Sequence, residues 1–323
     1  MNPIRYLYRT SPRARRALRL TKNRVTSRAA QSAFDYVAKK PLDQALALGD
    51  RVGALAYRVL RQQRDLAEEH VRHAFGDTLA PALRTHLVRS SFMNVARCFI
   101  ELAKIDEIRA RRAEYFEVVG WHHAEKVLAA GRGAVVVTGH IGNWELLAAY
   151  WAWSGHPVVA IARRIYAEEL NRMLVNFRER QGVETVLRES PNSARQILAA
   201  MKRNALLAML IDQDTKVQSV SVPFFGRLAR TPVAAASLAV RRELPAVAAF
   251  IQRRPEGGHR ITILPPFEIE RTGDVHADIK ALTRRFNDAI ERQIRANPAE
   301  WVWWHRRWRR GPIVDLDLDP AVA

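Results

Sequence analysis

One histidine of the chain lies in a setting that suits proton transfer. His140 belongs to the stretch Thr138-Gly-His-Ile-Gly-Asn-Trp-Glu145, which directly follows the apolar run 134–137. An imidazole has an unperturbed pKa of about 6.5, so it can accept and return a proton near neutral pH. A carboxylate on the second ring nitrogen would fix its tautomer, and we expect Glu145 to accept that hydrogen bond. The stretch therefore predicts general-base catalysis by a His140–Glu145 dyad.

The spacing between the two residues requires a bend in the chain. In a continuous helix, side chains five positions apart point about 140° away from each other. Gly139 and Gly142 flank His140 closely enough to allow the bend. A histidine followed five residues later by an acid arises about once by chance in such a composition, so the surrounding residues must carry the prediction. A structural histidine near a helix start is the open alternative.

The elements that must position this stretch are short strands alternating with helices. After Gly120, β-branched or apolar runs at 134–137, 158–161, 183–187, 206–211, 246–251 and 260–264 are separated by stretches with helical periodicity. This alternation predicts an α/β fold with a mostly parallel central sheet flanked by helices. Open sheets of this kind bind ligands at the carboxyl ends of their strands, which is where His140 falls.

A helical preface comes before the sheet. Residues 42–108 repeat apolar positions at helical spacing, and Pro41 and Pro81 punctuate them. We expect a single domain over 41–312, with the helical preface at 41–115. A basic segment at 1–40 precedes it, and a short acidic tail at 313–323 follows it.

The net charge indicates the kind of binding partner, and the cysteine content indicates the compartment. The 323 residues carry 52 lysines and arginines against 33 acids, a net charge of +19, so we expect an anionic partner. Arginine supplies most of the positive charge, and its planar fork suits phosphates. The single cysteine, Cys98, excludes an internal disulfide and fits a reducing compartment.

The sequence predicts a peripheral protein if a membrane is involved. The N-terminus lacks the apolar centre of a secretory signal, and the longest uncharged stretch, 146–162, is interrupted by Ser154-Gly-His-Pro157. Residues 1–28 contain nine basic residues and no acid, which suits an anionic leaflet at about 1 kcal/mol per basic residue. A disordered basic tail is the alternative.

Four sequence blocks, taken in order, resemble those of a known family. They are 138–145, 162–164, 212–214 followed by 222–226 and Thr231, and 297–308. The blocks are similar to those of the bacterial lipid A late acyltransferases of the lauroyl and myristoyl type, within the lysophospholipid acyltransferase-like superfamily. The resemblance extends over roughly residues 42–310.

The resemblance implies a fold, a reaction and a place in the cell. The fold would be that of the glycerol-3-phosphate acyltransferases. The reaction would move a fatty acyl chain from acyl carrier protein (ACP) to a hydroxyl of a phosphorylated glycolipid, a lipid A precursor. The protein would lie peripherally on the anionic lipids of the cytoplasmic face of the bacterial inner membrane. No cofactor or metal is expected, because the acyl donor is a substrate and two acids in one loop are a weak metal site.

Further candidate residues follow from the same blocks. The candidates for substrate binding are Asn143, Arg163, Arg164, Asp212, Asp214, Phe224, Phe225, Arg306 and Arg307. Arginines at a strand end could bind an acceptor phosphate or the carrier's phosphopantetheine arm. The phenylalanines could line the acyl chain, and Asp212 could orient basic groups or the loop. Solvated arginines and core phenylalanines are the alternative interpretations.

Two other functions are compatible with the sequence. The first block also resembles the acyltransferases of phosphatidylinositol mannosides, whose acceptor differs and whose donor can be acyl-CoA. The run 301–310 holds four tryptophans and four arginines, which suits a membrane interface or stacking on single-stranded nucleic acid. Part of this run is expected in the core, with Trp301 and Trp304 on one face if it is helical. Nucleic-acid binding ranks lower, because no recognised binding module is present.

Overall fold

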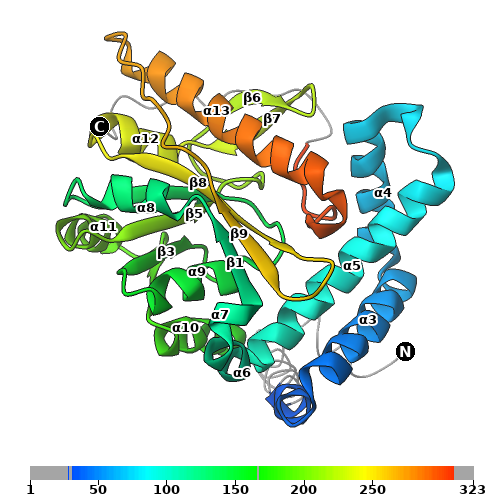
Figure 1. Ribbon diagram of the computed structural model, residues 1–323. Helices are drawn as coiled ribbons and strands as arrows, with labels where there is room; N and C mark the ends of the chain where they lie inside the picture. The colour runs from blue at the N-terminus through cyan, green and yellow to red at the C-terminus, as the bar shows by residue number, and fades with distance from the viewer. Residues whose placement is uncertain (1–27, 29–30, 166, 309–323) are drawn as a thin grey trace, which may run out of the picture.

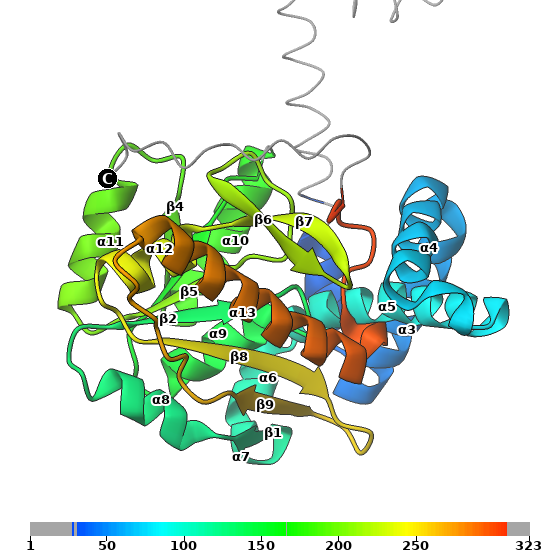
Figure 2. The same ribbon diagram turned by 90° about the horizontal axis from the view of Figure 1, so that it is seen from above.

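A computed structural model describes residues 28, 31–165 and 167–308, and a seven-stranded sheet lies at its centre (Figures 1 and 2). The strands run in the order β1-β9-β8-β2-β5-β3-β4. Their bounds are β1 (Phe116–Val119), β2 (Ala134–Thr138), β3 (Val158–Ala162), β4 (Val183–Leu187), β5 (Leu206–Leu210), β8 (Ala246–Arg253) and β9 (His259–Ile263). Neighbours pair in parallel except β8 and β9, which are antiparallel. The predicted mostly parallel sheet is confirmed, and all six predicted runs are strands.

Strand β2 shows why the strand sequences are continuously apolar. All of its residues are buried, and they alternate between two cores. Val135 and Val137 pack into one core, whereas Ala134 and Val136 pack into the other. A parallel sheet covered on both faces needs apolar side chains at every position, so an alternating pattern is not expected.

Helices cover both faces of the sheet. On one face, α8 (Trp121–Leu128), α9 (Trp144–Trp153) and α10 (Glu168–Arg180) share a core with the strands. On the other face, α11 (Ser193–Lys202), α12 (Ala234–Arg241) and α13 (Val275–Ala296) do the same. The long α13, orange in Figure 1, crosses its face of the sheet.

The predicted helical preface is also confirmed. It comprises α3 (Leu42–Val59), α4 (Arg61–Phe75), α5 (Pro81–Ala103), α6 (Ile105–Ala110) and α7 (Arg112–Tyr115), with the 3₁₀ turn η1 (Gly76–Thr78). Pro41 immediately precedes α3 and Pro81 is the first residue of α5, as expected of helix starts. Helices α3, α4 and α5 lie together beside the sheet (Figure 1), and α5 carries side chains to the ends of β8 and β9.

A hairpin that the sequence did not predict packs on the α13 face. Strands β6 (Ser219–Phe224) and β7 (Arg227–Pro232) pair antiparallel and contact α13. The chain then ends its described part with the 3₁₀ turn η2 (Pro298–Glu300) and residues 301–308. The hairpin buries the aromatic pair that ends β6, and this changes the role expected for those rings.

Two predicted segments lie wholly or mostly outside the described residues. The acidic tail 313–323 lies outside them entirely. Most of the basic segment 1–40 also lies outside them, and its described residues 31–38 are helical. Within the described part of the chain, every helix is too short or too polar to cross a bilayer.

Candidate active site

Two neighbouring strands bring the central residues of the site together. Strands β2 and β5 pair in parallel, with Thr138 opposite Leu210 at their carboxyl ends. His140 lies two residues beyond β2, and Asp212 lies two residues beyond β5. Parallel strands end at the same edge of a sheet, so the two side chains meet there.

Asp212 binds His140 twice. Its Oδ1 accepts a hydrogen bond from the ring Nδ1 at 2.7 Å, and its Oδ2 accepts from the His140 backbone N–H at 2.7 Å. The indole Nε1 of Trp301 donates to the same Oδ2, also at 2.7 Å. The Asp212 side chain is fully buried, whereas the His140 side chain is 18% exposed. One ring nitrogen is thus held inside the protein, and the ring reaches the surface.

The electrostatics of Asp212 favour a charged carboxylate. Burial alone would raise the pKa of the Asp212 carboxyl, but the His140 imidazole and the hydrogen bonds from His140 and Trp301 outweigh it. The net result is a pKa well below the usual range. A buried carboxylate that stays ionised keeps the proton on Nδ1 and stabilises the ring when it becomes an imidazolium.

The second ring nitrogen of His140 faces an amide and another histidine. The Gln213 side-chain amide donates to His140 Nε2 at 3.1 Å and to His305 Nδ1 at 2.5 Å. The two imidazole rings stand edge to face, with centroids 4.7 Å apart. Burial, together with His140, lowers the pKa of His305 to about 3, so His305 is neutral and can accept from Gln213. With the proton on Nδ1 facing Asp212, the His140 tautomer that fits these contacts leaves on Nε2 the lone pair that a general base requires.

Glu145 has a different partner from the one that the sequence predicted. Both of its oxygens accept hydrogen bonds from the Arg178 guanidinium on α10, at 2.6 and 2.8 Å. This ion pair is largely buried, with 8% and 11% of the two side chains exposed. The expected hydrogen bond from His140 to Glu145 is therefore wrong, because α9 turns Glu145 toward α10 and the strand order brings Asp212 to the ring.

The predicted bend in the His140 loop is confirmed at Gly142. Gly142 has φ of +58°, and a Cβ there would lie 2.0 Å from the carbonyl oxygen of Ile251. At Gly139, a Cβ would lie 3.0 Å from Asp212 Oδ2. One glycine thus allows the turn, and the other allows the carboxylate to approach the backbone.

The tryptophan-rich end of the chain brackets the loop. Ile141 and Trp301 form an antiparallel bridge, Val302 N–H donates to the His140 carbonyl, and Gly142 N–H donates to the Glu300 carbonyl. Trp301 and Trp303 are fully buried in the core. The prediction that part of this run lies in the core is confirmed, but residues 301–308 are not helical.

Several predicted binding residues lie near the site edge and reach solvent. Arg163 and Arg164 follow β3, whose pairing with β5 places them at the same edge as His140, and both are exposed. Arg306 is exposed as well, and its carbonyl accepts a hydrogen bond from the Asp214 N–H. These positions are accessible to an anionic ligand.

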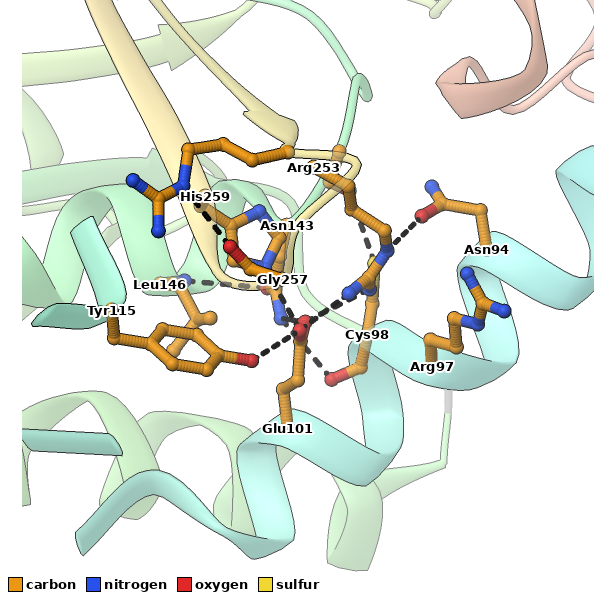
Figure 3. Close-up of polar contacts among 12 residues, drawn as sticks. Asn94, Arg97, Cys98, Glu101, Tyr115, Asn143, Leu146, Arg253, Gly257 and His259 are labelled. Carbon is orange, nitrogen blue, oxygen red and sulfur yellow. Dashed lines mark hydrogen bonds and ion pairs between the residues drawn. The ribbon is translucent and has the colours of Figure 1, made fainter. Parts of the chain in front are cut away.

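Other predicted binding residues are buried. Asn143 is 1% exposed, and its side chain caps α9 by accepting from the Leu146 N–H (Figure 3). Phe224 and Phe225 are in the core and contact the tryptophans of the 301–308 segment. In this structure these three side chains hold the fold, so they line no surface for an acyl chain or an acceptor.

Arg307 is fully buried too. It donates to the Arg230 carbonyl, to Thr231 Oγ1 and to Asn287 Oδ1, and its guanidinium lies 4.4 Å from the Phe224 ring centroid. Burial lowers the pKa of Arg307 to about 10, partly opposed by Asp212 and Asp214. The side chain ties the C-terminal segment to β7 and α13.

An open cavity of about 770 Å³ lies elsewhere, between α3 and the turn that joins β8 to β9. Its lining mixes charges, including Asp50, Arg97, Glu107 and Arg253. Such a lining does not suit an alkyl chain, and neither His140 nor Asp212 belongs to it.

Three contributors to the site were not predicted. Gln213 and His305 fall inside the quoted blocks, but no spacing indicated that they meet at His140. Arg178 had no signal beyond its charge, since it reaches Glu145 from a separate helix. The sequence shows only that His140 and Asp212 each follow a strand. The pairing of β2 with β5, which places the residues after these two strands side by side, is visible in the structure alone.

The sequence of this chain is similar to those of known bacterial acyltransferases. A family described as bacterial lipid A biosynthesis acyltransferase matches residues 18–310. The phosphatidylinositol mannoside acyltransferase of Mycolicibacterium smegmatis is 30% identical over 234 residues, covering 71% of this chain and 73% of that protein. The Mycobacterium tuberculosis H37Rv protein of the same name is 29% identical, covering 69% and 70%. The lipid A biosynthesis palmitoleoyltransferase of Escherichia coli K12 is 23% identical over 277 residues, covering 84% and 87%.

Proposed function

Because the chain belongs to the bacterial lipid A biosynthesis acyltransferase family, we propose that it acylates a hydroxyl of a phosphorylated glycolipid, with acyl-ACP as donor and a lipid A precursor as acceptor. The His140–Asp212 pair carries this proposal. A solvent-reaching imidazole held by a fully buried carboxylate is the arrangement that a general base requires.

The transfer step uses both ring nitrogens. The acceptor hydroxyl takes the place of the Gln213 amide on His140 Nε2, gives up its proton, and its oxygen attacks the thioester carbonyl. Asp212 holds Nδ1–H and stabilises the imidazolium that forms. The tetrahedral intermediate then expels the thiolate, which takes the proton from Nε2. An ester forms, a thioester breaks, and free thiol leaves.

In this proposal Asp212 orients the His140 ring, which is the role that the sequence analysis predicted for Glu145. In this proposal, Glu145 and Arg178 are positioning residues that hold α9 against α10 behind the catalytic loop. No cofactor enters the step, because the thioester is already activated and is consumed as a substrate.

The positive charge suits the proposed substrates. Arg163, Arg164 and Arg306 are exposed at the site edge and would bind acceptor phosphates or the acidic carrier. The net charge of +19 also suits an anionic lipid surface, so we place the protein peripherally on the cytoplasmic face of the inner membrane.

The names of the relatives favour a second acceptor. The relatives at 29% and 30% identity are named phosphatidylinositol mannoside acyltransferases, whereas the lipid A palmitoleoyltransferase is 23% identical. An inositol mannoside lipid with acyl-CoA as donor is therefore the alternative substrate pair. Both pairs require the same step at His140.

A matrix of two donors and two acceptors tests the proposal. Purified protein is incubated with acyl-ACP or acyl-CoA and with a lipid A precursor or a phosphatidylinositol mannoside, and product masses are recorded. We expect one acyl chain added to one acceptor, and no product from His140→Ala. Hydrolysis of the donor without acceptor modification in every combination would contradict the proposal.

A further inference from the structure

A second buried carboxylate lies behind the His140 loop. Glu101, on α5, is 0% exposed and accepts five hydrogen bonds (Figure 3). Its Oε1 accepts from Tyr115 Oη at 2.9 Å, Arg253 Nη1 at 2.5 Å and His259 Nε2 at 2.8 Å. Its Oε2 accepts from Arg253 Nη2 at 3.0 Å and Asn143 Nδ2 at 2.8 Å.

The surroundings of Glu101 favour the ionised carboxylate, and both of its oxygens accept hydrogen bonds. Burial alone would raise the pKa of Glu101, but Arg253 and His259 outweigh it and hold the pKa well below the usual range. The Arg253 side chain is 15% exposed, and its Nε donates to Asn94 Oδ1 at 2.7 Å. Burying such a pair costs several kcal/mol per ion, and apolar residues fill a core at less cost. The pair is therefore weak evidence for added stability, and its contacts indicate what else it holds in place.

Asn143 connects Glu101 to the catalytic loop. Its amide nitrogen donates to Glu101 and to the Cys98 carbonyl at 3.2 Å, while its oxygen caps α9. Cys98 Sγ also donates to the carbonyl of Gly142, at 3.1 Å. Asn143 lies three residues after His140, so a rotation of its side chain would move the loop and the first turn of α9 together.

The same network reaches the loop from its other side. The backbone N–H of Arg253 donates to both carboxylate oxygens of Glu300, at 3.0 and 3.1 Å. The Glu300 carbonyl in turn accepts from the Gly142 N–H at 3.0 Å. The loop is thus held between α5 and the 300–302 segment, and Arg253 contacts both holding carboxylates.

We propose that Glu101 is a positioning residue for the acyl transfer reaction: through Asn143 it fixes the direction in which the His140 ring presents Nε2. The inference rests on the proposed function of His140. Glu101 and Asn143 touch no substrate. The structure predicts that loosening their contact lowers turnover through misplacement of the base, since displacement by about 1 Å can cost ~100-fold in rate.

The test variant is Asn143→Ser, and Asn204→Ser is its matched control. Serine keeps an oxygen that can cap α9 but loses the amide donor to Glu101 and Cys98. Asn204 makes the same two kinds of contact at the amino end of β2: it accepts from the Gly133 N–H at 2.7 Å and donates to the Leu128 carbonyl at 3.0 Å. It also has φ of +56°, which serine adopts less readily than asparagine, so its replacement by serine should destabilise the fold as well.

We expect Asn143→Ser to lower kcat by about 10- to 100-fold with KM changed less than about threefold. Asn204→Ser should lower the melting temperature comparably with kcat within about twofold of wild type. Glu101→Gln should reproduce the kcat loss, and Asn143→Ser decides the matter if Glu101→Gln does not fold. The second readout is the ¹⁵N spectrum of the His140 imidazole, assigned by its absence in His140→Gln.

Both readouts must change in Asn143→Ser. Equal kcat in Asn143→Ser and Asn204→Ser, or unchanged His140 ¹⁵N shifts, would overturn the positioning role. The spectrum needs no turnover, so it reports on positioning even if another residue proves to be the base. Full activity of His140→Gln would instead refute the proposed function while leaving the effect of Asn143 on the ring measurable.

Discussion

Among the residues that the structure describes, Asp212 and Glu101 are buried carboxylates that each bind a histidine, and the two histidines differ in solvent access. Asp212 binds His140 at 2.7 Å, and Glu101 binds His259 at 2.8 Å. Both carboxylates are 0% exposed, but the His140 side chain is 18% exposed and His259 is 0% exposed. A close contact between imidazole and carboxylate therefore does not identify a catalytic base. Access of the second ring nitrogen to a substrate does.

The neighbours of the two carboxylates differ as well. Asp212 accepts its hydrogen bonds from the ring and the backbone N–H of His140 and from the Trp301 indole, and none of these donors is a guanidinium or an ammonium group. Glu101 accepts from the cation Arg253 through both oxygens. The charge of Asp212 remains available to stabilise an imidazolium, whereas that of Glu101 is already neutralised. The first pair suits proton transfer, and the second suits rigid support.

Exchanging each histidine for glutamine should give the largest difference. His140→Gln should lower kcat by about 10⁴-fold, because the base is removed, with little change in melting temperature. His259→Gln should lower kcat by less than about tenfold and destabilise the fold by roughly 1–3 kcal/mol, because it removes a buried partner of Glu101. Turnover and thermal unfolding of both variants provide the measurement. Equal kcat losses would remove the distinction between the pairs.

Asp212→Asn should have the next largest effect. An asparagine keeps the volume but lacks the charge that holds the proton on Nδ1, so kcat should fall by about 10³-fold with KM nearly unchanged. Steady-state kinetics at saturating donor would measure this. A variant with more than a tenth of wild-type kcat would show that the carboxylate is not needed to orient the ring.

The fold could be predicted from the sequence further than the site could. Continuous apolar runs such as 134–137 and 206–211 marked the parallel strands, because burial on both faces leaves a strong compositional signal. The hairpin β6–β7 was missed, because its residues include Arg227 and Arg230 and its end was interpreted as an acyl-binding wall.

His140 could be selected from the sequence as the candidate base, but its partner could not. The expected partner, Glu145, is close in sequence, whereas Asp212 is 72 positions away and meets His140 only through the order of β2 and β5. The other wrong expectations concerned side chains that proved to be buried. Asn143, Phe224 and Arg307 have residue types common in binding sites, but in the structure Asn143 caps α9, Phe224 packs in the core, and Arg307 forms buried hydrogen bonds to β7.

Glu145 is a third buried carboxylate, and its partner is the guanidinium of Arg178. Glu145→Gln leaves a guanidinium buried without its counter-charge, which should cost about 3 kcal/mol of unfolding free energy. The double variant Glu145→Gln/Arg178→Gln should recover part of that loss. Urea unfolding of the two single variants and the double variant measures the coupling. Additive losses would mean that the ion pair contributes nothing beyond its separate side chains.

Glu300 should give the smallest effect, and the size of this effect depends on pH. Burial, only partly offset by Arg253, raises its pKa from 4.5 to about 7. The folded state therefore binds this proton more tightly than the unfolded state, and the group destabilises the fold progressively as pH rises from about 4.5 to 7. Glu300→Gln should gain roughly 2 kcal/mol over wild type between pH 5 and pH 8, as measured by urea unfolding. A pH-independent difference would refute this.

The position of the proton on each of the two histidines distinguishes a catalytic pair from a structural one. Imidazole ¹⁵N NMR at neutral pH should show the His140 proton on Nδ1, with Nε2 as the hydrogen-bond acceptor, and His259 with a proton on Nε2 facing Glu101. Asp212→Asn should change the His140 pattern and leave that of His259 in place. A His140 ring whose neutral form carries its proton on Nε2 would contradict its assignment as the base.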